Sequence, residues 1–228
     1  MKEILKIINL LNKGYSLLRV LQIIEFDKIH FNNKDFSADL GSLPNKSHNI
    51  SSIKKLKNIK YFNLNIENES QKKNTEIINF EKLNQNKFKN IRSKFDKVLL
   101  FNVLEHIYEY KNTIIFSKYI LKKKSWLIGS TPFMFRLHGS PFDYYRFTNT
   151  LLEKELKSIG FKKISIKPLG YGIFTMFLNS IMVYNKYIPF LNTFLFLIMA
   201  LFDKILNIFS KGNKSNYPIG YFFRANKK

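Results

Sequence analysis

The hydrophobic residues of this chain form short segments whose spacing changes between that of helices and that of strands. Residues 2–26 carry polar side chains at roughly every third position, which leaves a broad apolar face and predicts one or two helices. Gly14 predicts a break between them. Continuous or alternating apolar runs predict strands within residues 36–45, 59–67, 76–83, 95–103, 125–133 and 161–169.

Helices are expected in the intervals between the later strands. One follows residue 103 and extends to Leu121. A second begins at a capping box formed by Thr150 and Glu153 and ends at Gly160. Strands that alternate with helices at short spacing predict an α/β fold, in which helices cover a parallel sheet.

Two charge-free runs, Pro168 to Asn185 and Tyr187 to Phe202, follow the last of these strands. Neither supplies the ~20 predominantly apolar residues of a spanning helix, because glycine, asparagine and Pro189 interrupt them. We therefore expect residues 171–210 to form helices that lie on a membrane surface, or a re-entrant hairpin. A hydrophobic lid or a dimer interface is the alternative.

The composition supports a folded protein and excludes several kinds of site. With 228 residues, 45% of them hydrophobic, the chain can form an α/β domain with a core of its own, and global disorder is excluded. The absence of cysteine excludes a disulfide scaffold, a thiol nucleophile and a zinc–thiolate site, and no metal is expected. The first residues, MKEILKIINLL, lack a small-residue cleavage site, so we expect no signal peptide and a cytoplasmic protein.

The net charge of +22 raises the question of nucleic-acid binding. The basic residues are almost all lysines scattered along the chain, with arginine at only five positions (19, 92, 136, 146 and 224). Base and phosphate recognition favours arginine for its bidentate geometry, so the pattern disfavours nucleic acid. The chain is also rich in Asn, Ile and Phe, so we instead expect the lysines to reflect drift under A/T-rich codon usage, with some help toward an anionic membrane surface.

Several motifs together indicate a known fold. In chain order they are ADLGS, FDKVLLFNVLEHI, LKKKSWLIGSTPF and HGSPFDYYRFT, followed by a helix closed by GF. This set resembles class I S-adenosylmethionine-dependent methyltransferases, and most closely bacterial members that have a membrane-like C-terminal insertion and are associated with surface-sugar or lipid modification. The resemblance covers residues 36–170 and resumes at YPIGYFFRANKK, which looks like the last, antiparallel strand of that family.

The resemblance implies a Rossmann-like sheet, mostly parallel with an antiparallel last strand, plus a hydrophobic helical insertion. It divides the chain into an N-terminal amphipathic helical region at 1–30, a methyltransferase core at 31–170, the insertion at 171–212 and the last strand of the core at 213–228. The sequence carries no signal that distinguishes a monomer from an oligomer.

By the same resemblance, the cofactor is S-adenosylmethionine. Asp39 would organise its methionine end, and Gly41 and Ser42 would line it. Leu43 stands where the family has its second loop glycine. The remaining cofactor-binding positions, for the ribose, the adenine and one wall, would be Asn65, Glu67, Glu81 (with Asn79 nearby) and Asn102.

The acceptor side is expected after the fifth strand, in the loop that contains His138. A histidine there suits the removal of a proton from a hydroxyl acceptor, although it could equally pin the loop by hydrogen bonding. His106 is a second candidate catalytic residue, whereas Glu105 beside it is explained by the favourable position of an acid near a helix N-terminus. Asp143, Tyr144 and Arg146 are candidate substrate-binding residues, or Asp143 and Arg146 form a local salt bridge.

The sequence therefore predicts a methyltransferase that acts on an oxygen or nitrogen of a small, glycan or lipid-linked acceptor. The alternative from another class is a non-catalytic, membrane-associated interaction protein that keeps this fold.

Overall fold

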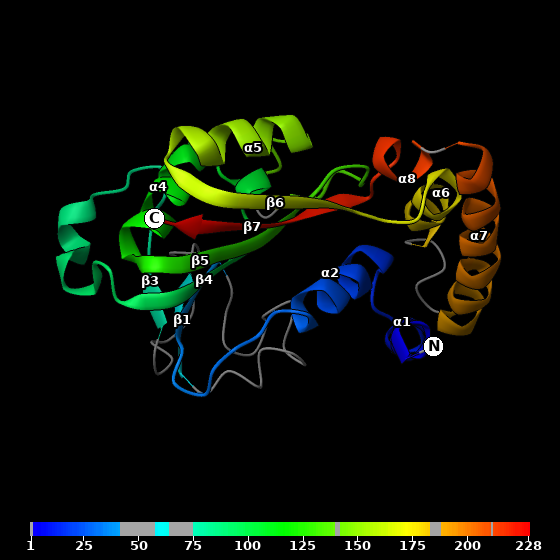
Figure 1. Ribbon diagram of the computed structural model, residues 1–228, viewed down its shortest axis with the longest axis horizontal. Coiled ribbons are helices and arrows are strands. Elements are labelled where there is room, and N and C mark those ends of the chain that lie inside the picture. The colour runs from blue at the N-terminus through cyan, green and yellow to red at the C-terminus, as the bar shows by residue number, and fades with distance from the viewer. Residues whose placement is uncertain (1, 42–57, 64–74, 140–141, 183–187, 211) are drawn as a thin grey trace. The chain divides into compact units, whose positions relative to one another are not determined.

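The computed structural model describes residues 2–41, 58–63, 75–139, 142–182, 188–210 and 212–228 (Figure 1). Four positions of the expected cofactor loop and ribose site, Ser42, Leu43, Asn65 and Glu67, lie outside these residues, as do Asn185 and Tyr187 at the junction of the two charge-free runs. The strands are β1 (Phe36–Leu40), β2 (Asn58–Asn63), β3 (Thr75–Ile77), β4 (Phe95–Phe101), β5 (Leu121–Pro132), β6 (Phe161–Leu169) and β7 (Gly220–Lys227). The helices are α1 (Lys2–Asn12), α2 (Leu17–Asp27), α4 (Tyr110–Ile120), α5 (Asn149–Ser158), α6 (Ile173–Ile181), α7 (Pro189–Phe209) and α8 (Asn213–Asn216), with 3-10 turns η1 (Gln85–Ile91) and η2 (Leu104–His106).

The strands form one seven-stranded sheet in the order β3-β2-β1-β4-β5-β7-β6. The strands from β3 to β5 pair in parallel, and β7 runs antiparallel to the rest (Figure 1). The chain moves outward in one direction from β1 and in the other from β4, so the switch in strand order lies between these two strands. In such sheets ligands bind beyond the carboxyl ends of the strands at this switch. The predicted sheet is confirmed, including its last strand.

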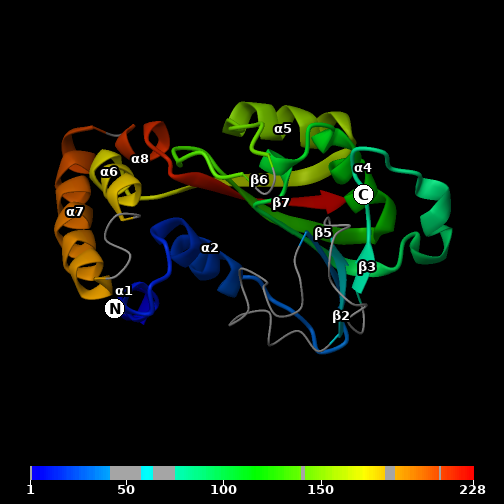
Figure 2. The same ribbon diagram turned by 180° about the vertical axis from the view of Figure 1, so that it is seen from behind.

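The centre of the sheet is buried because β4 is apolar on both faces. Val98, Leu99 and Leu100 of β4 are fully buried, as the continuous apolar run of its sequence predicts. Phe116 of α4 contacts the rings of Phe62, Phe80 and Phe88 edge-on and joins this helix to the sheet. Helices α4 and α5 flank the sheet (Figure 2).

The starts of helices α4 and α5 differ from the sequence prediction. The cap of α5 is Thr148, whose hydroxyl accepts a hydrogen bond from the backbone N–H of Leu151 at 3.2 Å, and not Thr150. Thr148 has the extended backbone of a cap, whereas Thr150 already lies inside the helix. The helix expected directly after β4 is also interrupted, because residues 104–106 form η2 and α4 begins only at Tyr110.

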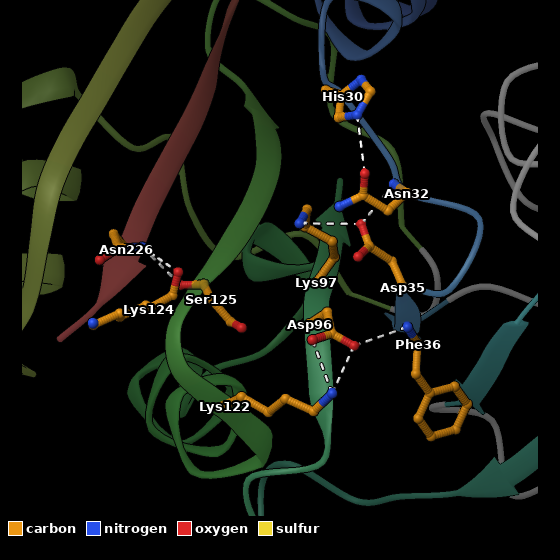
Figure 3. A network of polar contacts seen from close by, with 10 residues as sticks. All are labelled: His30, Asn32, Asp35, Phe36, Asp96, Lys97, Lys122, Lys124, Ser125 and Asn226. Carbon is orange, nitrogen blue, oxygen red and sulfur yellow. Dashed lines mark hydrogen bonds and ion pairs between the residues drawn. The ribbon is translucent and has the colours of Figure 1, made fainter.

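A network of polar contacts joins the amino ends of β1, β4 and β5 (Figure 3). The carboxylate of Asp96 accepts hydrogen bonds from the backbone N–H of Phe36 at 3.0 Å and from the ammonium of Lys122 at 2.8 and 2.9 Å. Beside it, the ammonium of Lys97 lies 3.3 Å from the carboxylate of Asp35. These contacts hold the amino ends of the strands, whereas ligands are expected at the carboxyl ends.

The chain forms two compact units, each assembled from several segments. The first comprises residues 1–29, 132–137 and 167–222, and the second comprises residues 30–131, 138–166 and 223–228. Within the first unit α1 and α6 both contact α7 (Figures 1 and 2). The hydroxyl of Thr193 in α7 also donates a hydrogen bond to the side-chain oxygen of Asn12 at 2.6 Å. The N-terminal helices and the hydrophobic segment therefore belong to the same unit.

Helix α7 is longer than the sequence analysis predicts. It has 21 residues, and by length and composition alone it could cross a membrane, with 22% of its most apolar stretch buried. Pro189 does not interrupt it but occupies its first turn, where proline is favourable because the missing N–H needs no partner. The expectation that no segment here reaches about 20 residues of apolar helix is therefore wrong.

One acidic side chain of α7, Asp203, is completely buried within the first unit. Its carboxylate accepts hydrogen bonds from the backbone N–H groups of Phe174 at 3.0 Å and Thr175 at 2.9 Å, and from the Thr175 hydroxyl at 2.8 Å. The side-chain amide of Asn213 in α8 donates a further bond at 3.2 Å. Asp203 thus caps the N-terminus of α6, where a negative charge is favourable, and ties three helices together.

Candidate functional site

The carboxyl end of β1 carries the first candidate cofactor residues. Asp39 is almost completely buried in the strand. Gly41 directly after the strand has a φ of +95°, which favours glycine, and its N–H donates a hydrogen bond to the carbonyl of Phe62 at 2.7 Å. The backbone therefore turns sharply at the edge of the sheet, next to a buried carboxylate.

The adjacent strand β4 ends at Asn102, the second part of this edge. Asn102 has a φ of +52°, a conformation that is strained for a residue with a side chain and that often marks functional sites. Its N–H donates to the carbonyl of Ser130 in β5 at 2.9 Å, and the Ser130 hydroxyl lies 3.4 Å from its side-chain oxygen. Asp39, Gly41 and Asn102 thus lie at the carboxyl ends of two neighbouring strands, at the switch point of the sheet.

Glu81 has a partner within the protein. Its two carboxylate oxygens accept hydrogen bonds from the backbone N–H groups of Tyr108 at 2.7 Å and Glu109 at 3.0 Å. The side chain of Asn79 accepts bonds from the N–H groups of Glu81 and Lys82 and shapes the turn that presents Glu81. Glu81 therefore holds the segment before α4, and its contact with adenine stays a prediction.

The acceptor loop is organised around Asp143. The guanidinium of Arg146 donates to its two oxygens at 2.5 and 2.7 Å, and the backbone N–H of His138 donates at 2.9 Å. Burial opposes ionisation of Asp143, but these hydrogen bonds and the charge of Arg146 outweigh it and lower the pKa to about 2. The Nδ1 atom of His138 lies 3.2 Å from the same carboxylate. The predicted Asp143–Arg146 salt bridge is therefore present, and it also orients His138.

His106 lies against His138, which the sequence alone does not reveal. Their ring centroids are 5.0 Å apart, with the rings nearly perpendicular. Nδ1 of His106 is 2.6 Å from the carbonyl oxygen of Phe142, which can only accept, so this nitrogen carries the proton. The loop after β5 thus folds back onto the segment after β4, and the backbone N–H of Tyr144 confirms this by donating to the carbonyl of Glu105 at 2.7 Å.

Glu105 is the functional candidate that the sequence analysis missed. It is fully buried, and burial raises the pKa of its carboxyl to about 8. Neither carboxyl oxygen has a hydrogen-bond partner among the residues that the structure describes, and Nε2 of His106 lies 3.8 Å away. An acid at a helix N-terminus is commonly exposed, so the helix-dipole interpretation gave no reason to expect this burial.

Aromatic side chains form the outer part of the loop. The ring of Tyr144 packs edge-on against Tyr108 with centroids 5.5 Å apart, and Phe142 lies 5.6 Å from it. Tyr144 is 43% exposed, so it can offer an apolar surface to a ligand. The second unit therefore contains both predicted catalytic histidines, all three predicted substrate-binding residues and the buried Glu105 in one neighbourhood.

Comparisons with known proteins agree on the fold and give no closer relationship. No protein-family profile matches the sequence, and no curated protein matches it significantly in sequence. Solved structures do match. An S-adenosylmethionine-dependent methyltransferase from Archaeoglobus fulgidus is 13% identical, with a TM-score of 0.55, over 86% of this chain and 87% of that one.

Two further structures show the range of proteins with this fold. Phosphoethanolamine N-methyltransferase 2 of Haemonchus contortus, solved with S-adenosylmethionine, is 13% identical with a TM-score of 0.53; the match covers 92% of this chain and 52% of that one, so this chain spans about half its length. The (4+2)-cyclase SpnF is 12% identical with a TM-score of 0.54, over 92% of this chain and 81% of that one.

Proposed function

We propose that this chain, which has the fold of class I S-adenosylmethionine-dependent methyltransferases, binds that cofactor and transfers its methyl group. The observation that carries the proposal is the switch point of the sheet, where the buried Asp39 precedes the left-handed turn at Gly41 and the neighbouring strand β4 ends directly before Asn102. An acid and a close backbone turn at this position suit the cationic methionine end of the cofactor.

The acceptor side supports transfer to an oxygen or nitrogen. When bound, S-adenosylmethionine supplies a methyl group on a positively charged sulfur. The acceptor atom would take this methyl group and would have to lose its proton, so the chain must position the acceptor and provide a way for the proton to leave. Because Nδ1 of His138 faces the ionised Asp143, the lone pair of the neutral imidazole is on Nε2.

That lone pair can serve the transfer in two ways. It can take the acceptor proton itself, in which case Asp143 stabilises the imidazolium that forms. It can instead hold a cation that lowers the pKa of the acceptor. A small molecule, a glycan or a lipid-linked acceptor with a hydroxyl or amino group fits either role, and the Tyr144 ring offers it an apolar surface.

The first experiment is calorimetric titration of the purified protein with S-adenosylmethionine and S-adenosylhomocysteine. Asp39→Ala should weaken binding by roughly 100-fold or more, because a charge-assisted contact to the amino acid end is lost. Asp35→Ala is the matched control, since Asp35 lies at the opposite end of β1 and pairs with Lys97. A folded wild type that gives no heat at millimolar cofactor would refute the proposal and favour a non-catalytic interaction protein on this fold.

We also propose that α7 places the protein on the inner face of the cell membrane. Large apolar side chains are exposed along the whole helix: Phe190, Phe194, Leu197, Leu201, Phe202, Ile205, Ile208 and Phe209. The charge of its one acid, Asp203, is buried against α6 and is therefore kept away from this surface. The net charge of +22 favours an anionic surface, and Lys204 and Lys214 are placed in or near this helical segment.

Fractionation with and without carbonate tests this location. The wild type should sediment with anionic vesicles and be released by carbonate, as expected of a helix that lies on the surface. Phe194→Glu with Leu201→Glu should abolish sedimentation, whereas Ile77→Glu, an equally exposed apolar site on β3, should not. A monodisperse protein that does not bind vesicles would contradict the proposal and would indicate that α7 forms a lid or a dimer interface. Resistance to carbonate would show insertion instead of surface binding.

A further inference from the structure

Three side chains of metal-binding type converge in the second unit. Glu105 and His106 come from η2, and His138 comes from the loop after β5. Each offers one ligand atom, and these three atoms all lie within 4.8 Å of one another. His138 follows the other two residues by 32 and 33 positions, so the fold brings the three together and no sequence motif reveals the cluster.

The hydrogen bonds around the two imidazoles aim the same nitrogen at the cluster. Nδ1 of His106 donates to the carbonyl of Phe142, and Nδ1 of His138 faces the carboxylate of Asp143. In its neutral form, each ring therefore carries its lone pair on Nε2. Histidines that bind metals are held in the same way, with the second ring nitrogen bonded to a carbonyl or carboxylate.

Glu105 supplies an independent observation. Its carboxyl is fully buried, and neither oxygen has a hydrogen-bond partner within the described residues. A buried polar group without a partner costs free energy, and native proteins satisfy nearly all such groups. A bound cation, which displaces the carboxyl proton, would satisfy the Glu105 oxygens and the two imidazole lone pairs together.

We propose that Glu105, His106 and His138 bind one divalent transition-metal ion of the zinc type. Two histidines and one glutamate form a known ligand set for zinc, with three protein ligands and an open position. Imidazole nitrogen also favours such ions over Mg²⁺ and Ca²⁺, which prefer oxygen ligands. Metal–ligand bonds of about 2.0–2.1 Å require the three atoms to approach one another by roughly an ångström, which side-chain rotations can provide.

A metal ion at this position would change the role of His138. Its Nε2 would be a ligand, and the open position would take the acceptor oxygen or nitrogen and lower its pKa. Asp143 would then be a positioning residue that orients His138 toward the ion. This consequence rests on the proposed methyl transfer, whereas the metal site itself does not.

The test uses the full-length protein without an affinity tag, stripped with a chelator, because a polyhistidine tag binds the same ions. Zn²⁺ is titrated by calorimetry, and Co²⁺ by the visible absorption bands that appear when it enters a site of low coordination number. One ion per chain should bind, and Zn²⁺ should displace Co²⁺. The measurement needs neither cofactor nor acceptor.

Variants assign the ligands. His138→Ala and Glu105→Gln should each lower the affinity by roughly 100-fold or more, and Asp143→Asn by roughly 10- to 100-fold, the range for residues that support a ligand. Glu105→Gln keeps the size of the buried side chain, so a folded variant is available. His30→Ala is the control, because His30 bonds to Asn32 and is outside the cluster.

The inference is overturned if the wild type shows no saturable binding of either ion, or if His138→Ala and Glu105→Gln bind as tightly as the wild type. Calorimetry with S-adenosylmethionine on the stripped protein separates the two proposals. Metal binding without cofactor binding would sustain the metal site and refute the methyltransferase, and the reverse result would refute the metal site alone.

Discussion

Replacing Asp203 by alanine removes the acceptor of four hydrogen bonds at a completely buried position. The Thr175 hydroxyl keeps a partner, because the carbonyl of Gly172 lies 3.1 Å from it. Within the described residues, the backbone N–H groups of Phe174 and Thr175 and the side-chain amide of Asn213 have no second acceptor, so three donors lose their partner. The change therefore removes the cap of α6 and the link to α8 together.

The free energy of unfolding should fall by about 4 kcal/mol. A buried donor left unsatisfied costs about 1–3 kcal/mol, which applies to Thr175 and Asn213. Phe174 is more exposed, so water can replace the lost partner and the cost is about 1 kcal/mol. For a chain of this length each kcal/mol lowers the midpoint of thermal unfolding by about 2–4 °C, which predicts a decrease of about 10 °C.

Thermal unfolding followed by circular dichroism measures this decrease. Asp203→Asn should lie about halfway, because its amide keeps one acceptor oxygen, and Lys204→Ala on the exposed side should change stability by less than about 0.5 kcal/mol. An Asp203→Ala midpoint within 2 °C or so of the wild type would refute the assigned hydrogen bonds. In that case Asp203 would not hold α6, α7 and α8 together.

Two further predictions concern the second unit. His138→Ala should lower methyl transfer by roughly two orders of magnitude while calorimetry shows nearly unchanged cofactor affinity; equal losses of activity and stability would assign His138 to the structure of the loop alone. The stability of the protein should depend on pH through Asp96. Burial opposes ionisation of this carboxyl, but the hydrogen bonds from Lys122 and from the N–H of Phe36 lower its pKa. Its stabilising effect is therefore present above about pH 4 and is lost as the pH falls through the lowered pKa. Asp96→Ala should accordingly be less stable than the wild type in urea at pH 7, and the difference should shrink at pH 3.

The sheet could be predicted from the sequence because its strands carry strong local signals. The run FDKVLLF is apolar on both faces, and β4 forms there as expected. Helix boundaries that depend on the backbone conformation of one residue were harder to predict from the sequence. Thr148 and Thr150 are both plausible caps in sequence, and only the extended backbone of Thr148 identifies it as the cap.

Helix α7 shows why counting charges along the sequence underestimates how long and how apolar a helix is. Asp203 ends the charge-free run in the sequence, but in the structure its charge is used inside the unit to cap α6. The exposed surface of α7 is therefore more apolar than its composition suggests. A sequence gives the number of charges on a helix and not the direction in which each one points.

The candidate site was predictable in its parts and not in its arrangement. His106, His138 and Asp143 were identified from their positions after β4 and β5. Their mutual contacts depend on the path of the loop, which the bond from the Tyr144 N–H to the Glu105 carbonyl fixes. Burial of Glu105 follows from the same path, and local pattern carries no information about it.

The contact between α1 and α7 has a consequence for synthesis on the ribosome. The apolar face of α1, with Ile7, Leu10 and Leu11, is buried in the first unit, and α7 is one of the helices that it contacts. Helix α7 is translated about 180 residues later, which takes roughly 10–35 s at about 5–20 residues per second. During this interval the N-terminal helices lack a native neighbour and expose apolar surface. We therefore expect a ribosome-associated chaperone to hold the nascent chain until α7 has emerged from the exit tunnel.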